Sequence, residues 1–274
     1  MNRLYLIDKQ ISDFQKKIWE FYGKNKRDLP WRSTIDPYKI FISEVMLQQT
    51  QVERVIPKYE AFIKEFADFQ SLAKASPFLV LRLWQGLGYN RRALHLQRSA
   101  QIISQHYNNV LPKDPKILDG LPGIGEATAS SLVVFSYNLP FSFIETNIRR
   151  VYIHFFFPQK KEVRDTAILL LVERTMDKKN PREWYWALMD YGAMLGKTID
   201  NPNKRSAHYQ KQPRFKGSNR ELRGKILKYL MTKGPTIKEK LTKDLKESHE
   251  RIEKIVADLK KEGLIKIERN RLLV

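Results

Sequence analysis

Glu44 and Glu145 stand apart from the other acidic residues of the chain because of the residues around them. Glu44 lies in the apolar stretch Ile42–Leu47, and the amide-rich string Gln48-Gln49-Thr50-Gln51 follows it. Apolar neighbours withdraw water from a carboxyl group and raise its pKa, so such a glutamate can hold and donate a proton near neutral pH. Glu145 directly precedes Thr146–Arg150, a basic segment with the pattern of a helix start. Each glutamate also has a simpler interpretation, Glu44 as a solvated helix-surface residue and Glu145 as a helix cap.

A second chemical feature is the segment Leu121-Pro122-Gly123-Ile124-Gly125-Glu126-Ala127-Thr128, which separates two helical stretches. Its glycines, Gly123 and Gly125, allow backbone amides and a helix N-terminus to face outward, which is a ready site for a phosphate. Together with an acid placed before a basic helix, this segment indicates a protein that grips a nucleic-acid backbone and presents a carboxylate beside it. The pattern predicts chemistry on DNA.

The composition agrees with a polyanionic partner and excludes several classes of site. The chain has 50 Lys and Arg against 30 Asp and Glu, a formal charge of +20 over 274 residues. Such a surplus favours nucleic acid through counterion release, although a ribosomal or chromatin binder would share it. There is no cysteine, so disulfides, thiolate catalysis and cysteine-ligated clusters are excluded. The 5 histidines show no ligand spacing, and we predict no metal site.

No secretion signal is evident at the start of the chain, and no apolar run approaches the ~20 residues that cross a bilayer. We therefore expect no membrane partner and a cytoplasmic, nucleoid-associated protein.

Helical spacing of apolar residues dominates residues 1–198 and predicts an all-α body. Ser76-Pro77 has the pattern of a helix start, and Gly86-Leu87-Gly88 the pattern of a helix end. Further helices are expected over residues 90–106, 115–119, 126–137, 147–157, 162–176 and 181–195.

Composition shifts after residue 198. Residues 199–218 are polar and basic with little periodicity, which is typical of a linker. Residues 219–274 have the pattern of three helices and a β-hairpin that turns at Arg269-Asn270-Arg271, which predicts a small winged-helix (α+β) domain. Residues 201–274 carry 21 basic and 9 acidic side chains, a surplus of +12, so we favour a nucleic-acid role over a protein-interaction role for this domain.

Several motifs in order give the chain a family resemblance. It resembles the A/G-specific adenine DNA glycosylases, the MutY family of the helix-hairpin-helix glycosylase superfamily, over roughly residues 10–197. The motifs that carry the resemblance are Leu29-Pro30-Trp31, Pro37-Tyr38-Lys39, Ser43–Val52, Leu83–Tyr89, Leu121–Gly125 and Met189–Met194. It implies a six-helix barrel over residues 25–142 and a second helical domain from residues 1–24 and 143–198. It also implies a cleft between these domains that receives a base rotated out of the duplex.

The resemblance assigns roles to individual residues. Glu44 matches the acid that protonates the departing adenine and then assists the attacking water. Glu145 stands where the family usually has an aspartate that stabilises the oxocarbenium-like sugar. Gln49 and Tyr89 match residues that wedge into the duplex beside the opposite base. The hairpin would hold a phosphate, often with a bound monovalent cation; its residues are Leu121, Gly123, Gly125 and Thr128.

Neighbouring positions refine the expected chemistry. Ala127 stands where related lyases carry a nucleophilic lysine, so we expect a monofunctional glycosylase that leaves an abasic site. Arg91 and Arg92, next to Tyr89, are candidates for phosphate contact. So are Arg149 and Arg150.

Three departures from the family pattern bear on this expectation. Most relatives hold an iron–sulfur cluster through four cysteines, which this chain lacks, so it is a variant without the cluster; Lys204, Arg205, His208 and Tyr209 are candidates to hold that loop instead. Glu145 is one methylene longer than aspartate. The predicted winged helix stands in place of the usual Nudix-like C-terminal domain.

We therefore expect a monomer that acts on double-stranded DNA and excises adenine opposite guanine or 8-oxoguanine. The alternatives are a glycosylase for thymine, uracil or hypoxanthine, or a non-catalytic DNA-binding protein.

Overall fold

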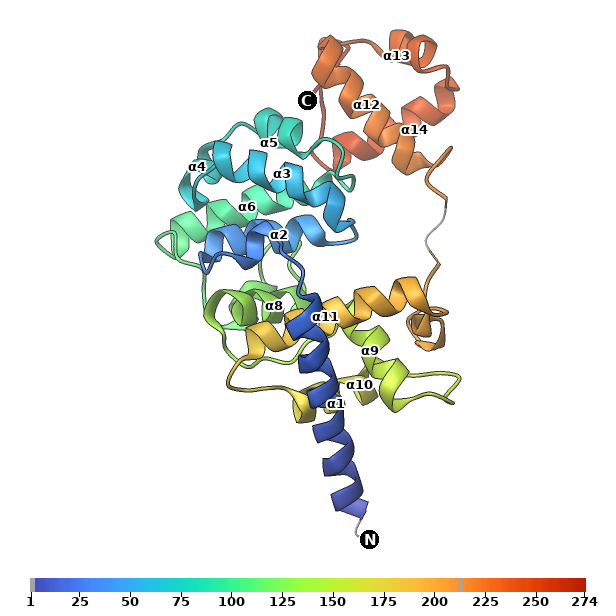
Figure 1. Cartoon of the computed structure of the whole chain (residues 1–274). Helices are drawn as coiled ribbons and strands as arrows, with labels where there is room; N and C mark the ends of the chain where they lie inside the picture. The colour runs from blue at the N-terminus through green and yellow to red at the C-terminus, as the bar shows by residue number, and fades with distance from the viewer. Residues whose placement is uncertain (1–2, 212–213) are drawn as a thin grey trace. The chain divides into compact units, whose positions relative to one another are not determined.

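The computed structural model describes residues 3–211 and 214–274, with side chains from Asp8 onward, and consists mainly of α-helices joined by short loops (Figure 1). The described residues divide into two compact units. Unit 1 contains the described residues up to Ile40, with Pro112–Gly120 and Ile124–Lys211. Unit 2 contains Phe41–Leu111, Leu121–Gly123 and the described residues from 214 onward. In the part of the chain that the structure describes, no helix is both long enough and apolar enough to cross a membrane.

Unit 1 is a helical body in which α9 and α1 both pack against α11. The helices expected over residues 115–119, 126–137, 147–157, 162–176 and 181–195 agree with the observed helices within three residues at each end. Its elements are α1 (Arg3–Asn25), η1 (Pro30–Arg32), α7 (Pro115–Asp119), α8 (Glu126–Tyr137), α9 (Thr146–Phe156), α10 (Asp165–Thr175), α11 (Pro181–Thr198) and η2 (Pro202–Arg205).

Aromatic side chains form the core of unit 1. Phe14 and Ile18 are one helical turn apart on α1 and are both buried. The Phe14 ring meets Tyr152 of α9 and Trp184 of α11 at centroid distances of 5.4 and 5.9 Å. Aromatic pairs at this separation add to the stabilisation that burial of their surface gives. The aromatic residues of α9 and α11 thus build the core that holds these two helices together.

Unit 2 begins inside α2 (Pro37–Leu47) and continues through α3 (Val52–Glu65), α4 (Phe69–Lys74), α5 (Pro77–Trp84) and α6 (Arg91–His106). The predicted start of α5 is confirmed: the Ser76 hydroxyl accepts a hydrogen bond from Leu79 N at 3.2 Å, and Pro77 occupies the first helical position. Phe62 and Trp84 are fully buried between α3 and α5.

The C-terminal part of unit 2 has the helices and the hairpin that its spacing predicts. They are α12 (Asn219–Lys233), α13 (Lys238–Leu245), α14 (His249–Lys261), β1 (Lys266–Glu268) and β2 (Arg271–Leu273). The strands are antiparallel, with Lys266 opposite Leu273, and the turn residues Arg269 and Asn270 have φ of 46° and 63°. The backbone N–H of Leu272 also donates to Thr236 O at 2.7 Å, which ties β2 to the start of α13.

Candidate active site

Glu44 lies on α2 directly before two buried apolar residues. Val45 and Met46 are 3% and 0% exposed, whereas Glu44 is half-buried. Glu44 therefore lies at the border between solvent and the apolar interior. This is a suitable environment for a group that must release and take up a proton.

Arg92 of α6 organises the end of the Glu44 helix. Its Nη1 donates to three carbonyl oxygens at that end, those of Val45, Met46 and Gln48, at 2.8, 3.0 and 2.6 Å. The last carbonyls of a helix have no partner within the helix, so a half-buried arginine that donates to them fixes where the helix ends. Desolvation lowers the pKa of Arg92 to about 10, so the guanidinium stays charged at neutral pH.

The same guanidinium also reaches two loops. Its Nη2 donates to Thr50 Oγ1 at 2.8 Å and to Gly88 O at 3.3 Å. Sequence reasoning placed Arg92 among the phosphate-binding candidates, but its guanidinium points into the protein because unpaired carbonyls lie there. Its neighbour Arg91 is exposed.

Gln49 and Tyr89, the two wedge candidates, share a rare backbone conformation. Their φ values are 53° and 46°, in the left-handed region that residues other than glycine seldom adopt. Both are exposed, Tyr89 by 39%. Each lies next to a residue that bonds to Arg92, so a single arginine holds both turns. Strained residues of this kind persist where the surrounding structure fixes them, and they are frequent at functional sites.

The Gly-containing turn is tied to the same region of unit 2. Gln48 Nε2 donates to Gly123 O at 3.2 Å, and Ser99 Oγ donates to Pro122 O at 3.0 Å. Gly123 has φ of 77°, and a Cβ at this position would lie 2.9 Å from Nδ1 of His95. Only glycine satisfies both the conformation and the close approach of His95.

The other hairpin candidates follow in the chain. Leu121 is buried, whereas Gly123 and Gly125 are exposed and Thr128 is half-buried. Gly125 is the N-cap of α8 and has an extended conformation. The exposed N-terminal residues of α8 fit the expected phosphate site, because the first amides of a helix have no partner within the helix.

Glu145 caps the N-terminus of α9 in unit 1. Its Oε1 accepts hydrogen bonds from the backbone N–H groups of Asn147 and Ile148 at 2.7 and 2.8 Å, and its Oε2 lies 3.3 Å from Asn147 Nδ2. Desolvation raises the pKa of Glu145, although these hydrogen bonds and the charges of Arg150 and Arg149 oppose the shift. Glu145 is therefore the N-cap of α9, and capping fixes its carboxylate at the end of this helix.

The arginines after Glu145 make contacts within unit 1. Arg149 forms a two-pronged ion pair with Asp165 at 2.8 and 2.6 Å. Arg150 Nη1 donates to Asn147 Oδ1 at 2.8 Å and to Gly192 O at 2.6 Å. Both guanidinium groups are thus already engaged within the protein, because acidic and carbonyl partners lie within reach on α10 and α11.

Two glycines on α11 allow this close packing. A Cβ at Gly192 would lie 2.3 Å from Asn147 O, and a Cβ at Gly196 would lie 2.6 Å from Arg150 Nη1. The Met189–Met194 motif therefore brings α11 against the first turn of α9, where Glu145 sits.

Polar contacts hold the segment after α11, where the family resemblance implies an iron–sulfur cluster in most members. Asn203 is 5% exposed, and its Nδ2 donates to Thr146 O at 2.9 Å. Val163 N donates to Arg205 O at 2.8 Å, and the Arg205 guanidinium donates to Phe157 O and Pro158 O. Of the residues expected to hold this loop, Arg205 does so, whereas Lys204 pairs with the nearby Asp200 at the surface.

The residues in this segment do not fit an iron–sulfur cluster, whose irons need thiolate ligands. Across residues 3–211 and 214–274, no three His, Cys, Asp or Glu side chains gather in a way that could hold a metal ion. The first part of the predicted linker is thus folded onto α9, and hydrogen bonds take the place of metal ligands there.

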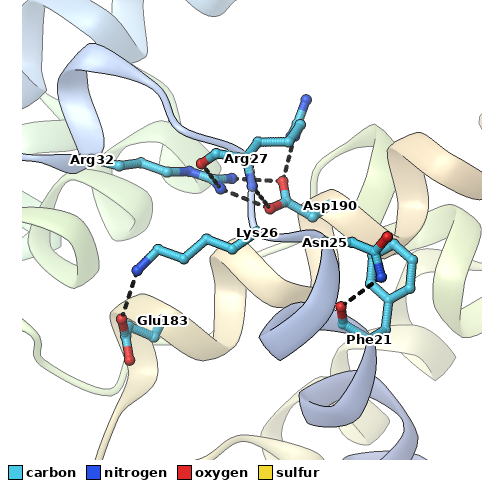
Figure 2. Close-up of polar contacts among 7 residues, drawn as sticks. All are labelled: Phe21, Asn25, Lys26, Arg27, Arg32, Glu183 and Asp190. Atoms are coloured by element: carbon cyan, nitrogen blue, oxygen red, sulfur yellow. Dashed lines mark hydrogen bonds and ion pairs between the residues drawn. The ribbon is translucent and has the colours of Figure 1, made fainter.

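A buried ion pair anchors α11 to the chain that leads into α2. Figure 2 shows the carboxylate of Asp190, on α11, in contact with both Arg32 and Arg27. Arg32 donates through both Nη atoms to the carboxylate at 2.8 and 2.9 Å, and the backbone N–H of Arg27 donates to it at 3.1 Å. The side chains of Asp190 and Arg32 are 1% and 5% exposed, so water screens this pair little.

Comparison with known families agrees with this geometry. Residues 42–173 match the model of the HhH-GPD superfamily base excision DNA repair proteins. An adenine DNA glycosylase of Buchnera aphidicola is 36% identical over 187 residues, which is 66% of this chain and 52% of that protein. An adenine DNA glycosylase of Mycolicibacterium smegmatis is 34% identical over 236 residues, which is 78% of this chain and 79% of that protein. The chain thus spans about half the length of the Buchnera relative and most of the Mycolicibacterium one.

A solved structure described as a thermostable thymine-DNA glycosylase superposes with a TM-score of 0.63 and 23% identity. The match covers 73% of this chain and 93% of that one. At this identity the likeness concerns the fold.

Proposed function

We propose that this chain, which belongs to the MutY family of helix-hairpin-helix DNA glycosylases in base excision repair, removes adenine paired with guanine or 8-oxoguanine. The observation that carries the proposal is the position of Glu44, which is half-buried on α2. Arg92 binds the end of this helix and both left-handed turns. In this proposal Glu44 is the proton donor, and Gln49 and Tyr89 enter the duplex.

The proposed reaction is hydrolysis of the N-glycosidic bond of a base rotated out of the duplex. Glu44 gives its proton to the departing base and then, as a carboxylate, assists the attacking water. Glu145 stabilises the positive charge that develops on the sugar. Two carboxyl groups in different environments suit this chemistry, because one must be protonated while the other is ionised.

The enzyme is monofunctional in this proposal. Strand cleavage by a lyase requires an amine nucleophile that forms a Schiff base with the sugar. Ala127 occupies the corresponding position at the start of α8 and cannot supply an amine. The product is therefore an abasic site in an otherwise intact strand.

Double-stranded DNA is the proposed partner of a monomeric enzyme. The exposed turn around Gly123 and Gly125 and the start of α8 bind a phosphate of the DNA. A monovalent cation at this turn would bring carbonyl oxygens and the phosphate together. Arg91 adds an exposed positive charge beside Tyr89.

The C-terminal helices and hairpin of unit 2 form a winged-helix domain in this proposal. The helix α14 and the hairpin present exposed basic side chains: Lys254, Lys260, Lys261, Lys266 and Arg269. An exposed basic helix followed by a basic hairpin suits DNA, because both can neutralise phosphates.

The experiment uses duplexes that hold one A:8-oxoguanine or A:G pair, with alkali treatment to break the strand at an abasic site. Cleavage by the wild-type chain and no cleavage by Glu44→Gln, with binding retained, is the expected result. A strand that stays intact at every enzyme concentration rejects the proposed activity, and tight binding without turnover would favour the non-catalytic alternative.

A second candidate is the same reaction on another base opposite guanine, such as thymine. Glu145 favours it, because the longer side chain stands where the family usually has aspartate and would shift the carboxylate at the sugar. A panel of duplexes with thymine, uracil or hypoxanthine opposite guanine separates the two candidates by their single-turnover rates.

A further inference from the structure

Arg220, near the start of α12, contacts the wedge candidate Tyr89. Its Nη1 lies 2.9 Å from the Tyr89 hydroxyl, and its guanidinium carbon lies 5.8 Å from the centre of the Tyr89 ring. Arg92 lies 5.7 Å from the same ring centre. Guanidinium groups at this range are attracted to an aromatic ring, so Tyr89 is held by α6 and α12 together.

Further contacts seat the C-terminal helices on the same part of unit 2. Gln85 Nε2 lies 3.3 Å from Met231 Sδ of α12. A Cβ at Gly263, just after α14, would lie 3.6 Å from Arg98 Nη2 of α6. The Arg220–Tyr89 pair is therefore one of several contacts between α12–α14 and the α5–α6 region.

The surroundings of Tyr89 are strongly basic. Arg54 donates to the carbonyl of Gly86 in the same turn, and Arg91 is exposed directly after it. Two acids on the C-terminal helices are paired with basic residues there: Glu221, next to Arg220, with Lys225, and Glu262 with Arg223. Several arginines around one exposed tyrosine repel one another, and an anionic partner would relieve that repulsion.

We propose that Arg220 is a DNA-contacting residue through which the C-terminal helices reach the strand opposite the excised base. This proposal rests on the proposed function, since that function places Tyr89 in the duplex beside the opposite base. A guanidinium next to such a residue reaches hydrogen-bond acceptors of that strand, either a phosphate or a base-edge acceptor such as O6 of guanine or 8-oxoguanine.

The experiment measures binding and cleavage by the full chain. Binding is measured with Glu44→Gln, so that the substrate stays intact, and with the same protein carrying Arg220→Ala or Arg220→Lys. Lys228→Ala is the matched control, because Lys228 is an exposed cation on the same helix. We expect Arg220→Ala to weaken binding of an A:8-oxoguanine duplex about tenfold, with an unchanged melting temperature, and Lys228→Ala to have little effect.

Two patterns of binding loss distinguish a phosphate acceptor from a base-edge acceptor. If Arg220 binds a phosphate, Arg220→Ala weakens binding to every duplex alike and lowers the slope of log Kd against log salt by about 1. If it binds a base edge, the loss is confined to duplexes with guanine or 8-oxoguanine opposite adenine, and Arg220→Lys shares it. Either result supports the contact.

Other results would overturn the proposal that Arg220 contacts DNA. Unchanged binding by Arg220→Ala, or an equal loss in Lys228→Ala, would mean that only net charge matters. Tighter binding by Arg220→Ala would mean that Arg220 covers Tyr89 in the free protein. Single-turnover cleavage by the wild-type chain is run in parallel, so a lack of glycosylase activity is seen separately from the Arg220 comparison.

Discussion

Nη1 of Arg92 lies 2.6 Å from the carbonyl oxygen of Gln48, the residue directly before the left-handed Gln49. The same guanidinium bonds to Gly88, directly before the left-handed Tyr89. The helix that carries Glu44 and the two wedge candidates are therefore placed by one half-buried cation. This makes Arg92 a positioning residue, which acts on the reaction only through the segments that it holds.

Arg92→Lys should lower the single-turnover rate about 100-fold. The charge remains, but an ammonium group has no planar fork to span the Val45, Gln48 and Gly88 carbonyls. The eversion of a fluorescent adenine analogue in the duplex should weaken in parallel, which a purely structural role would not require.

The control for this variant is Arg82→Lys, an exposed arginine on α5. Urea unfolding shows whether Arg92→Lys is still folded under assay conditions. A rate equal to that of the wild type, or a loss explained wholly by unfolded protein, would contradict the positioning role.

Gly192→Ala tests the close approach of α11 to the start of α9. A Cβ there would meet the backbone oxygen of Asn147 at 2.3 Å, and backbone cannot yield as a side chain would. We expect a loss of about 3 kcal/mol in the free energy of unfolding, together with a lower excision rate because Glu145 caps the same turn.

Gly224→Ala is the matched control for that loss. Gly224 lies within α12, and a Cβ there would meet no atom within 4 Å. Alanine should raise the free energy of unfolding by about 0.5–1 kcal/mol, because it removes the flexibility of a helical glycine in the unfolded chain. Similar changes in both variants, measured by urea unfolding, would show that the space around Gly192 is larger than the structure indicates.

Local signals in the sequence predicted much of this fold. Ser76-Pro77 fixes the start of α5 because the hydroxyl and the proline ring act on their own backbone. Gly125 marks the start of α8, and the spacing of Leu222, Ile226 and Leu230 gives α12, because each signal acts within a few residues. Glu145 likewise could be identified as a cap from its neighbours alone.

Contacts between distant segments could not be predicted in this way. Arg92 was identified as basic and close to Tyr89, but the carbonyls that turn it inward lie more than forty residues earlier in the chain. Asn203 belongs to a stretch without apolar periodicity, and its partner is the backbone of Thr146. Arg220 meets Tyr89 across 131 residues. Polar contacts to backbone atoms leave no periodic pattern. Sequence reasoning therefore took the segment around Asn203 for part of a linker.

Asp190→Asn should destabilise the protein and reduce its sensitivity to acid. Desolvation raises the pKa of Asp190, but the hydrogen bonds and charges of Arg32 and Arg27 outweigh it, so the pKa lies below its ordinary value. A carboxyl with a lowered pKa stabilises the fold above its ordinary pKa, and this contribution is lost as the pH falls through the lowered value.

In urea unfolding at neutral pH, Asp190→Asn should cost about 3–5 kcal/mol, because it leaves Arg32 buried without its partner. Below about pH 4 the wild type should lose stability more steeply than the variant. Parallel curves for the two proteins between pH 6 and pH 3 would show that Asp190 does not carry this dependence.

Glu145→Gln separates the two interpretations of Glu145, as a cap and as a catalytic carboxylate. The amide oxygen of glutamine can accept the same backbone hydrogen bonds from Asn147 and Ile148, so the free energy of unfolding should change by only about 1 kcal/mol. The negative charge is lost, however, and with it the stabilisation of a cationic sugar. The single-turnover rate should therefore fall at least 100-fold.

The pH dependence supplies the independent readout. Because desolvation raises the pKa of Glu145, the wild-type rate should fall on the acid side at a pH above the ordinary glutamate value of about 4.3. Protonation there removes the charge that the reaction needs, so the residual activity of Glu145→Gln should lack this acid limb. The sign for stability is opposite: a raised pKa means that the folded state binds the proton more tightly, so this contribution is present at low pH and is lost as the pH rises through the raised value. A variant that keeps the wild-type rate and acid limb while losing stability would leave Glu145 as a cap alone.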